Sequence, residues 1–183
     1  MRHCFAKSID SAFYKNNYWK SGMNSQSYYD LLSTSPLGAE LEKQECEVLA
    51  KVLTTNSLKD GDVLIREGAT DDSLHVIISG KLAATHDTGG NDTVTLHVLH
   101  EGDIVGAMGF IDGKEHSASL LALSDTEIFS LRRQAFESLL NQHPQLVYKV
   151  MRTIIRSVHS TLIRMNRQFV EMNNYIMKEH GRY

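Results

Sequence analysis

The stretches Leu58-Lys-Asp-Gly-Asp-Val-Leu-Ile65 and Leu99-His-Glu-Gly-Asp-Ile-Val-Gly106 share one outline, and this repeat decides the fold. Each stretch places Gly-Asp between a preceding leucine and an apolar pair, a composition typical of a turn that opens a strand. Glycine adopts backbone conformations with positive φ at no steric cost. The repeat therefore predicts two equivalent corners of one β-roll.

The segments around these corners are short β-branched runs separated by Gly and Asp, as in an all-β barrel, sandwich or roll. The expected strands are Asp62 to Ile65, Leu74 to Ser79, Leu82 to His86, Thr93 to Leu99 and Glu127 to Leu131. Two helices are expected before them, one around Tyr28 to Leu32 that ends before Pro36 and one from Leu41 to Leu53. The predicted class is α+β, an antiparallel, jelly-roll-like β-roll (double-stranded β-helix) with N-terminal helices.

Helical spacing returns after Arg133, first from Gln134 to Gln142 and then from Pro144 toward Lys178. In the long helix, apolar residues recur at alternating steps of three and four over about four heptads, which predicts a coiled coil and a homodimer. These residues are Tyr148, Met151, Ile155, Val158, Leu162, Met165, Phe169, Met172 and Ile176. The alternative is a helix that packs only on its own roll. The basic residues Arg152, Arg156, Arg164 and Arg167 are interpreted as a solvated face.

The length of 183 residues suits one core with an appendage. We expect an aromatic and polar arm at 1–24, a roll with flanking helices at 25–143, and the coiled-coil helix with its tail at 144–183. The net charge of −3 argues against a dedicated nucleic-acid binder. Cys4 and Cys46 form no disulfide framework, and no signal peptide or long apolar run is present, so a soluble cytoplasmic protein without membrane contact is expected.

Several of these residues together resemble the cyclic nucleotide-binding domain, most closely the effector half of bacterial catabolite-activator-type (Crp/Fnr-like) regulators. The resemblance covers about Tyr28 to Met165. It rests on Gly61-Asp62, Ile65, Gly68, His75-Val-Ile-Ile-Ser-Gly80, Leu99, Gly102-Asp103, Gly106-Ala-Met-Gly-Phe110, Ser117-Ala118 and Pro144. It implies that Gly106 to Ala118 is a phosphate-binding cassette. The ligand-binding positions implied are Gly106, Ala107, Met108, Gly109, His116, Ser117, Ala118 and, on the long helix, Thr161.

Two cassette positions depart from the family pattern. The family has a glutamate for the ribose hydroxyl where this chain has Ala107, and an arginine for the phosphate where it has His116. Hydrogen bonds to charged groups contribute roughly 1.5 to 3 kcal/mol each, so the two losses weaken binding by about two to four orders of magnitude. We therefore expect a non-catalytic regulatory module whose nucleotide-like ligand is non-standard or absent, with no cofactor.

The sequence offers less support for other chemistries. The histidines His75, His86, His97, His100 and His116 raise the alternative of a cupin-like metal enzyme, but His97 and His100 should lie on opposite faces of a strand. No nucleophile-elbow or nucleotide fingerprint is found.

Activator-type regulators continue into a helix-turn-helix DNA-binding domain, whereas this sequence stops at Tyr183 with no recognition-helix pattern in its tail. We expect that the chain alone does not bind DNA, and that it signals through its dimer or a regulatory protein partner. The alternative is an effector-domain fragment of a cyclic-nucleotide-responsive transcription regulator.

Overall fold

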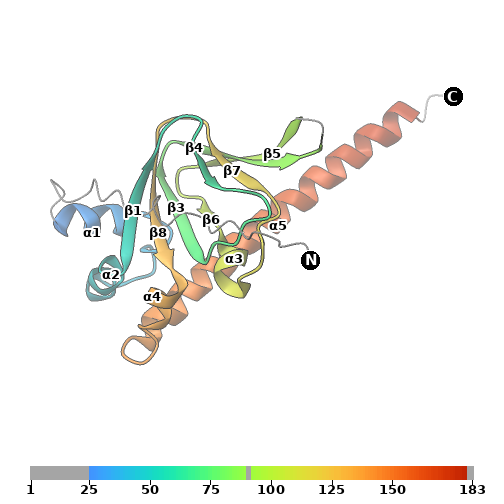
Figure 1. Cartoon of the computed structure of the whole chain (residues 1–183). Helices are drawn as coiled ribbons and strands as arrows, with labels where there is room; N and C mark the ends of the chain where they lie inside the picture. Colours follow the sequence, from blue (N-terminus) through green and yellow to red (C-terminus); the bar gives the residue numbers. More distant parts are fainter. Residues whose placement is uncertain (1–24, 90–91, 181–183) are drawn as a thin grey trace, which may run out of the picture.

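The computed structural model describes residues 25–89 and 92–180, so the arm expected at 1–24 lies outside the described residues. Figure 1 shows a central roll of strands, short helices beside it, and one long helix that passes behind the roll and extends well beyond it. This is the predicted α+β roll with N-terminal helices and a long C-terminal helix.

The described residues form five helices. Two precede the roll, one is inserted between strands, and two follow the last strand (Figure 1). They are α1 (Ser25–Thr34), α2 (Lys43–Ala50), α3 (Ala107–Asp112), α4 (Arg133–Glu137) and α5 (Pro144–His180). The long helix begins at Pro144, as predicted, because a proline in the first turn lacks only an N–H that has no intrahelical partner there.

The strands of the described residues form two four-stranded sheets in which every pairing is antiparallel. One sheet has the order β1-β8-β3-β6 and the other β2-β7-β4-β5. The strands are β1 (Leu53–Leu58), β2 (Val63–Ile65), β3 (Ser73–Ser79), β4 (Lys81–Asp87), β5 (Thr93–His100), β6 (Ile104–Val105), β7 (Ser119–Ala122) and β8 (Thr126–Arg132).

The sheet that contains β8 separates two apolar cores, because successive side chains of a strand point to opposite faces. Phe129 and Leu131 pack with residues of α2 and α5 in the helix-side core. Ile128, which precedes Phe129 and points to the other face, packs inside the roll with Ile77 and Leu82. The roll interior and the helix-side core therefore share one wall.

The two repeated corners have the same geometry, as predicted. Gly61 and Gly102 both adopt φ +85°. In each corner the aspartate that follows accepts a backbone hydrogen bond from three residues upstream, Asp62 from Lys59 N–H at 2.7 Å and Asp103 from His100 N–H at 2.8 Å. Each corner is stabilised by its own Asp side chain, so this prediction was possible from local sequence.

Some predicted boundaries were wrong. The second helix ends at Ala50, and Leu53 instead begins β1 by pairing with Leu131 of β8. The β1 sequence Leu-Thr-Thr-Asn-Ser-Leu has apolar residues only at its ends, so it lacks a clear alternation of period two. β6 and β7 were not predicted, since strands of two and four residues carry little pattern, and α4 ends at Glu137 rather than Gln142.

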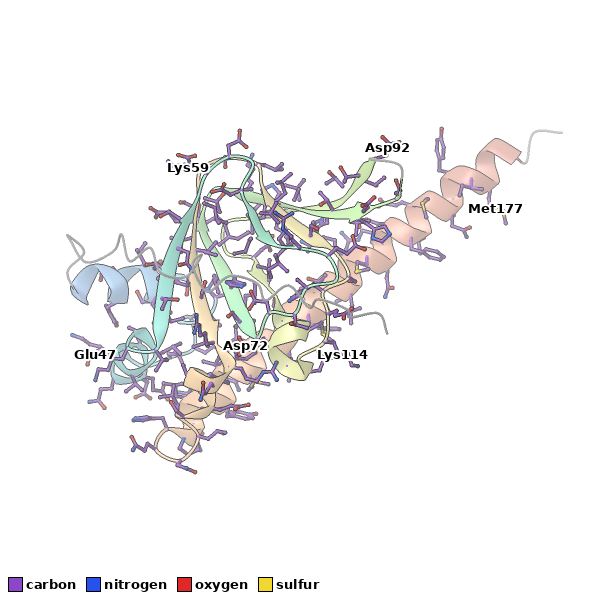
Figure 2. All side chains as sticks on the ribbon, in the orientation of Figure 1. Glu47, Lys59, Asp72, Asp92, Lys114 and Met177 are labelled. Carbon is purple, nitrogen blue, oxygen red and sulfur yellow. The ribbon has the colours of Figure 1, made fainter. Side chains whose placement is uncertain are left out.

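The long helix α5 has two parts. Its first part is buried against the helix-side core through Leu146, Val150 and Ile154, whereas every side chain from Met165 to Met177 is exposed. Figure 2 shows this distal part, ending near the labelled Met177, standing clear of the roll. Among the described helices, none is long and apolar enough to span a membrane.

Ion pairs attach the first part of α5 to the segment around α2. Lys149 Nζ lies 2.6 Å from Glu45 Oε2, and both Arg152 and Arg156 pair with Glu40. The chain before the roll is therefore bound to the helix that follows it by charge as well as by apolar packing.

Candidate functional site

The inserted helix α3 occupies the cassette position implied by the sequence. It lies between two glycines in the left-handed conformation, Gly106 with φ 77° and Gly113 with φ 71°. Gly106 has a further constraint, because a Cβ there would lie 2.6 Å from the carbonyl oxygen of Ser73. Phe110 packs beside Phe136 of α4 with ring centroids 5.6 Å apart. The helix is thus pressed onto the start of β3 and anchored by an aromatic pair.

A buried polar chain lies directly beneath Gly106. The His75 side chain is 2% exposed, and its Nδ1 is 2.8 Å from Ser130 Oγ while its Nε2 is 3.4 Å from Asp71 Oδ2. Asn56 Nδ2 donates to the same Ser130 oxygen at 2.9 Å. An ionised Asp71 only accepts, so a neutral His75 donates from Nε2 and accepts from the Ser130 hydroxyl.

The charge of Asp71 is stabilised by this hydrogen-bonded series of side chains. Burial alone raises the pKa of Asp71, but hydrogen bonds from the His75 side chain and from Ser73 outweigh it and hold the pKa below its usual range. The backbone N–H of Ser73 donates to Asp71 Oδ1 at 2.7 Å. The first residues of β3 therefore form a rigid polar support for the cassette helix.

The order Ser130, His75, Asp71 has the composition of a hydrolase triad, but its arrangement does not suit nucleophilic catalysis. Both Ser130 and His75 are buried, so the hydroxyl has no access to a substrate. A nucleophile needs both a base and exposure to the group it attacks. We interpret the hydrogen-bonded series Ser130, His75 and Asp71 as structural.

Gly109 brings His116 and Asp71 together. An added Cβ on Gly109 would lie 2.6 Å from both His116 Nε2 and the Asp71 carbonyl oxygen. The His116 ring therefore lies against α3, and its Nε2 is a buried atom with no hydrogen-bond partner among the described residues. Backbone bonds from His116 N–H to Ala69 and from Gly68 N–H to the His116 carbonyl hold the segment in place.

The remaining cassette positions do not converge on one point. Ala107 belongs to the helix-side core and is 8% exposed, whereas Met108 and Ser117 are exposed. Thr161 is partly buried on α5, one turn before Arg164. The structure thus brings Gly109 and His116 together, whereas the Met108 side chain is exposed to solvent.

Arg133 is a second cassette contact that sequence reasoning missed. Its Nη2 donates to the Gly109 carbonyl at 2.6 Å, and its guanidinium lies beside Gly113. Because the arginine caps the end of a six-residue helix, it supports α3 from behind rather than offering its charge to a ligand.

His97 projects from β5 toward α5. Burial and the positive charge of Arg164 lower the pKa of His97. His97 is partly buried and His100 is exposed, as expected for residues on opposite faces. In residues 25–89 and 92–180 no three His, Cys, Asp or Glu side chains gather as metal ligands.

A cavity of about 420 Å³ lies away from the cassette, between the end of α1 and the corner that joins β5 to β6. Its wall includes Leu31, Pro36, Ile78 and Glu101. The cavity and the cassette lie at different places in the fold, so it adds nothing to the cassette chemistry.

The residues predicted for a dimer seam lie along α5. Ile155, Leu162, Met165, Phe169 and Met172 are exposed, while Met151 and Val158 also pack partly on the helix-side core. Tyr148, in the same row, carries the guanidinium of Arg152 at 5.5 Å from its ring centroid. The row is therefore apolar and accessible over most of its length.

An antiparallel roll with a glycine-bounded helix between β6 and β7 and a long C-terminal helix defines a cyclic-nucleotide-type regulatory fold. A solved cyclic nucleotide-binding domain from Methylobacillus flagellatus has this fold, with a TM-score of 0.71, 22% identity, and coverage of 81% of this chain and 83% of that one. Residues 55–143 match the family model of the cyclic nucleotide-binding domain.

Curated relatives agree with this fold. The chain is 28% identical to the cAMP-dependent protein kinase regulatory subunit of Dictyostelium discoideum, over 69% of this chain and 39% of that protein. It is 26% identical to the Cyclic AMP receptor protein of Thermus thermophilus, over 67% of this chain and 56% of that one. A lysophospholipase of Aspergillus fumigatus is 26% identical over 57% of this chain and 7% of the enzyme. The chain thus spans between 7% and 56% of these relatives.

Residues 55–143 are therefore a cyclic nucleotide-binding domain, with homology to Crp-type activators and to regulatory subunits of cAMP-dependent protein kinase.

Proposed function

We propose that this protein is a non-catalytic regulatory module whose cassette does not bind cyclic AMP or cyclic GMP tightly, and that it acts as a homodimer through α5. The observation that carries the first part is the pair of substituted cassette positions. Ala107 offers no acceptor and lies in the helix-side core, and His116 lies against Gly109.

The charges around the cassette also disfavour a phosphate. Lys114 Nζ lies 3.4 Å from Asp112 Oδ2, so the nearest lysine already has a carboxylate partner. Glu115 precedes His116 in the sequence and adds negative charge to the same loop. A neutral imidazole replaces neither the charge nor the planar fork of an arginine.

Calorimetric titration with cyclic AMP and cyclic GMP tests the ligand proposal. A loss of two to four orders of magnitude from low-micromolar binding places the expected Kd between about 100 µM and 10 mM. Low-micromolar binding of either nucleotide would overturn the proposal.

The double variant Ala107→Glu, His116→Arg provides the converse experiment. It restores both charged groups, so we expect cyclic-nucleotide affinity to rise at least about 100-fold. His116→Gln is the matched control, since it changes the same loop without adding charge. If the double variant binds no better than the control, these two residues do not account for the weak site.

The dimer proposal rests on the exposed heptad row of α5. Leu162 and Phe169 are 52% and 65% exposed although both are large and apolar. A second copy of the same helix would remove them from water in a two-stranded coiled coil. No described element of the chain covers them.

Leu162→Asp places a charge in this seam and should yield monomers in sedimentation or light scattering. Ser160→Asp adds the same charge at an exposed position outside the seam. A dimer that survives Leu162→Asp, or a protein that is monomeric without any substitution, contradicts the proposed seam.

A further inference from the structure

The distal part of α5 carries a second apolar row beside the proposed dimer seam. This lateral row consists of Ile163, Val170 and Met177, which are 49%, 55% and 68% exposed. Its members are seven residues apart, like the seam residues Leu162 and Phe169 that precede two of them. All three side chains of the row are thus exposed to solvent.

The same row changes chemistry where α5 leaves the roll. Seven and fourteen residues before Ile163, it holds Arg156 and Lys149, which pair with Glu40 and Glu45 of the segment around α2. The row is therefore charged at Lys149 and Arg156, where Glu45 and Glu40 pair with it, and apolar from Ile163 onward, beyond these ion pairs. The apolar part of the row suits a partner that contacts α5 only beyond the roll.

The lateral row makes the apolar face of distal α5 too wide for a two-stranded coiled coil. With 3.6 residues per turn, Ile163 lies about 100° around the helix from Leu162, and Met165 lies about 60° to the other side. The two apolar rows together therefore span an arc of about 160°, with Asn166 and Asn173 between them, whereas a seam of a and d positions alone is narrower than the usual stripe of about 100°. One neighbouring helix covers only part of this face.

The period of seven indicates what kind of neighbour covers the rest. A straight helix drifts by about 20° per heptad relative to a strict seven-residue repeat. Residues repeated every seven positions therefore stay in line with a neighbour only when the helices supercoil around each other. Because the lateral row keeps one position relative to the seam over Ile163 to Met177, its neighbour must follow the same supercoil. It therefore belongs to the same bundle of helices.

A four-helix bundle fits these directions. Each helix in such a bundle has two neighbours about 90° apart, close to the angle between the seam and the lateral row. The side of α5 that packs on the roll, marked by Ile154, Thr161 and Arg164, lies about 80° to 160° around the helix from Leu162, on the side opposite the lateral row, so the rolls remain outside. The residues between the rows, Asn166 and Asn173, are uncharged amides.

We propose that two dimers of this chain associate through the lateral rows, forming a tetramer with a four-helix bundle of distal α5 segments. This inference rests on the proposed dimer. The lateral row begins only beyond the roll. The distal α5 segments of the two dimers therefore pack side by side in antiparallel orientation, and the rolls lie at opposite ends of the bundle. Closed dimers of dimers are the common form of soluble homotetramers.

Light scattering and sedimentation of the full chain over a range of protein concentrations test the tetramer. The unsubstituted protein should approach four chain masses at high concentration, and Val170→Glu should reduce this to two. Gln168→Glu is the matched control, because it adds the same charge on an exposed position outside both rows. The control should remain a tetramer.

Each other outcome is decisive. A protein that stays at two chain masses at every concentration, or a control that loses the tetramer as Val170→Glu does, overturns the lateral interface. A Val170→Glu monomer overturns it as well, because the row would then be the dimer seam itself. An unsubstituted monomer instead shows that the proposed dimer fails. Far-UV circular dichroism of each variant checks that α5 still forms.

Discussion

Substitution of Gly106 by alanine tests whether the cassette helix is pressed onto β3. The change has two costs. A non-glycine residue in the left-handed region costs roughly 1–2 kcal/mol. In addition, the new Cβ would lie 2.6 Å from the Ser73 carbonyl oxygen and 3.4 Å from the His75 ring. Forcing such a contact in a packed region typically costs about 1–3 kcal/mol.

Gly61→Ala is the matched control. Gly61 has φ +85°, and an added Cβ meets nothing within 4 Å, so it bears the conformational cost alone. We expect Gly61→Ala to lose about 1–2 kcal/mol and Gly106→Ala about 2–5 kcal/mol. In a chain of this length each kcal/mol lowers Tm by about 2–4 °C.

Thermal and urea unfolding at one fixed protein concentration measure both losses, with the concentration held because association shifts apparent stability. The diagnostic quantity is the difference between the two variants, since the strain of a positive φ cancels. If the two variants lose the same stability, the close approach of α3 to Ser73 does not exist in solution.

Two further predictions concern the charged contacts. Glu40→Gln removes the partner of Arg152 and Arg156; because these arginines are largely exposed, urea unfolding should show a loss of up to about 1 kcal/mol that shrinks in 1 M salt. Asp71→Asn should flatten the acid side of the pH–stability curve. The folded pKa of Asp71 lies below the ordinary 3.8, so its charge stabilises the fold above that pH, and this is lost as pH falls from about 5 through the folded pKa.

Both predictions have matched controls. Glu47→Gln removes an exposed carboxylate from α2, the helix that follows Glu40, and should leave stability unchanged at either salt concentration. Asp60→Asn, the control for Asp71→Asn, removes an exposed carboxylate from the corner at Gly61 and should likewise leave stability unchanged. A salt-independent loss in Glu40→Gln, or an unchanged acid transition in Asp71→Asn, would contradict the stated role of each group.

The cassette shows where prediction from sequence succeeded and where it stopped. The resemblance located the segment from Gly106 to Ala118, and the structure places α3 there. It did not identify His75 as the support beneath Gly106, although His75 was among the quoted residues. The long-range partner of His75 is Ser130, which also accepts from Asn56, 74 positions away. These residues meet only because β1 and β3 both pair with β8.

The secondary structure divides in the same way. The corners at Gly61 and Gly102 were predictable because each is closed by the aspartate that directly follows its glycine. β1 was not, because its Thr-Thr-Asn-Ser centre has no apolar alternation, and the hydrogen bonds of β8 determine that it is a strand.

The sequence by itself determined the local features of this protein, namely the Gly-Asp corners, the start of α5 at Pro144 and the heptad spacing of its apolar residues. Each depends on interactions within a few residues, which local sequence encodes. Only the tertiary structure decided which of the α5 residues stay exposed, and that Arg156 pairs with Glu40 while Ile163, seven residues later in the same row, stays about half exposed. Burial depends on which distant elements fold against a face, and the helical repeat alone does not contain that information.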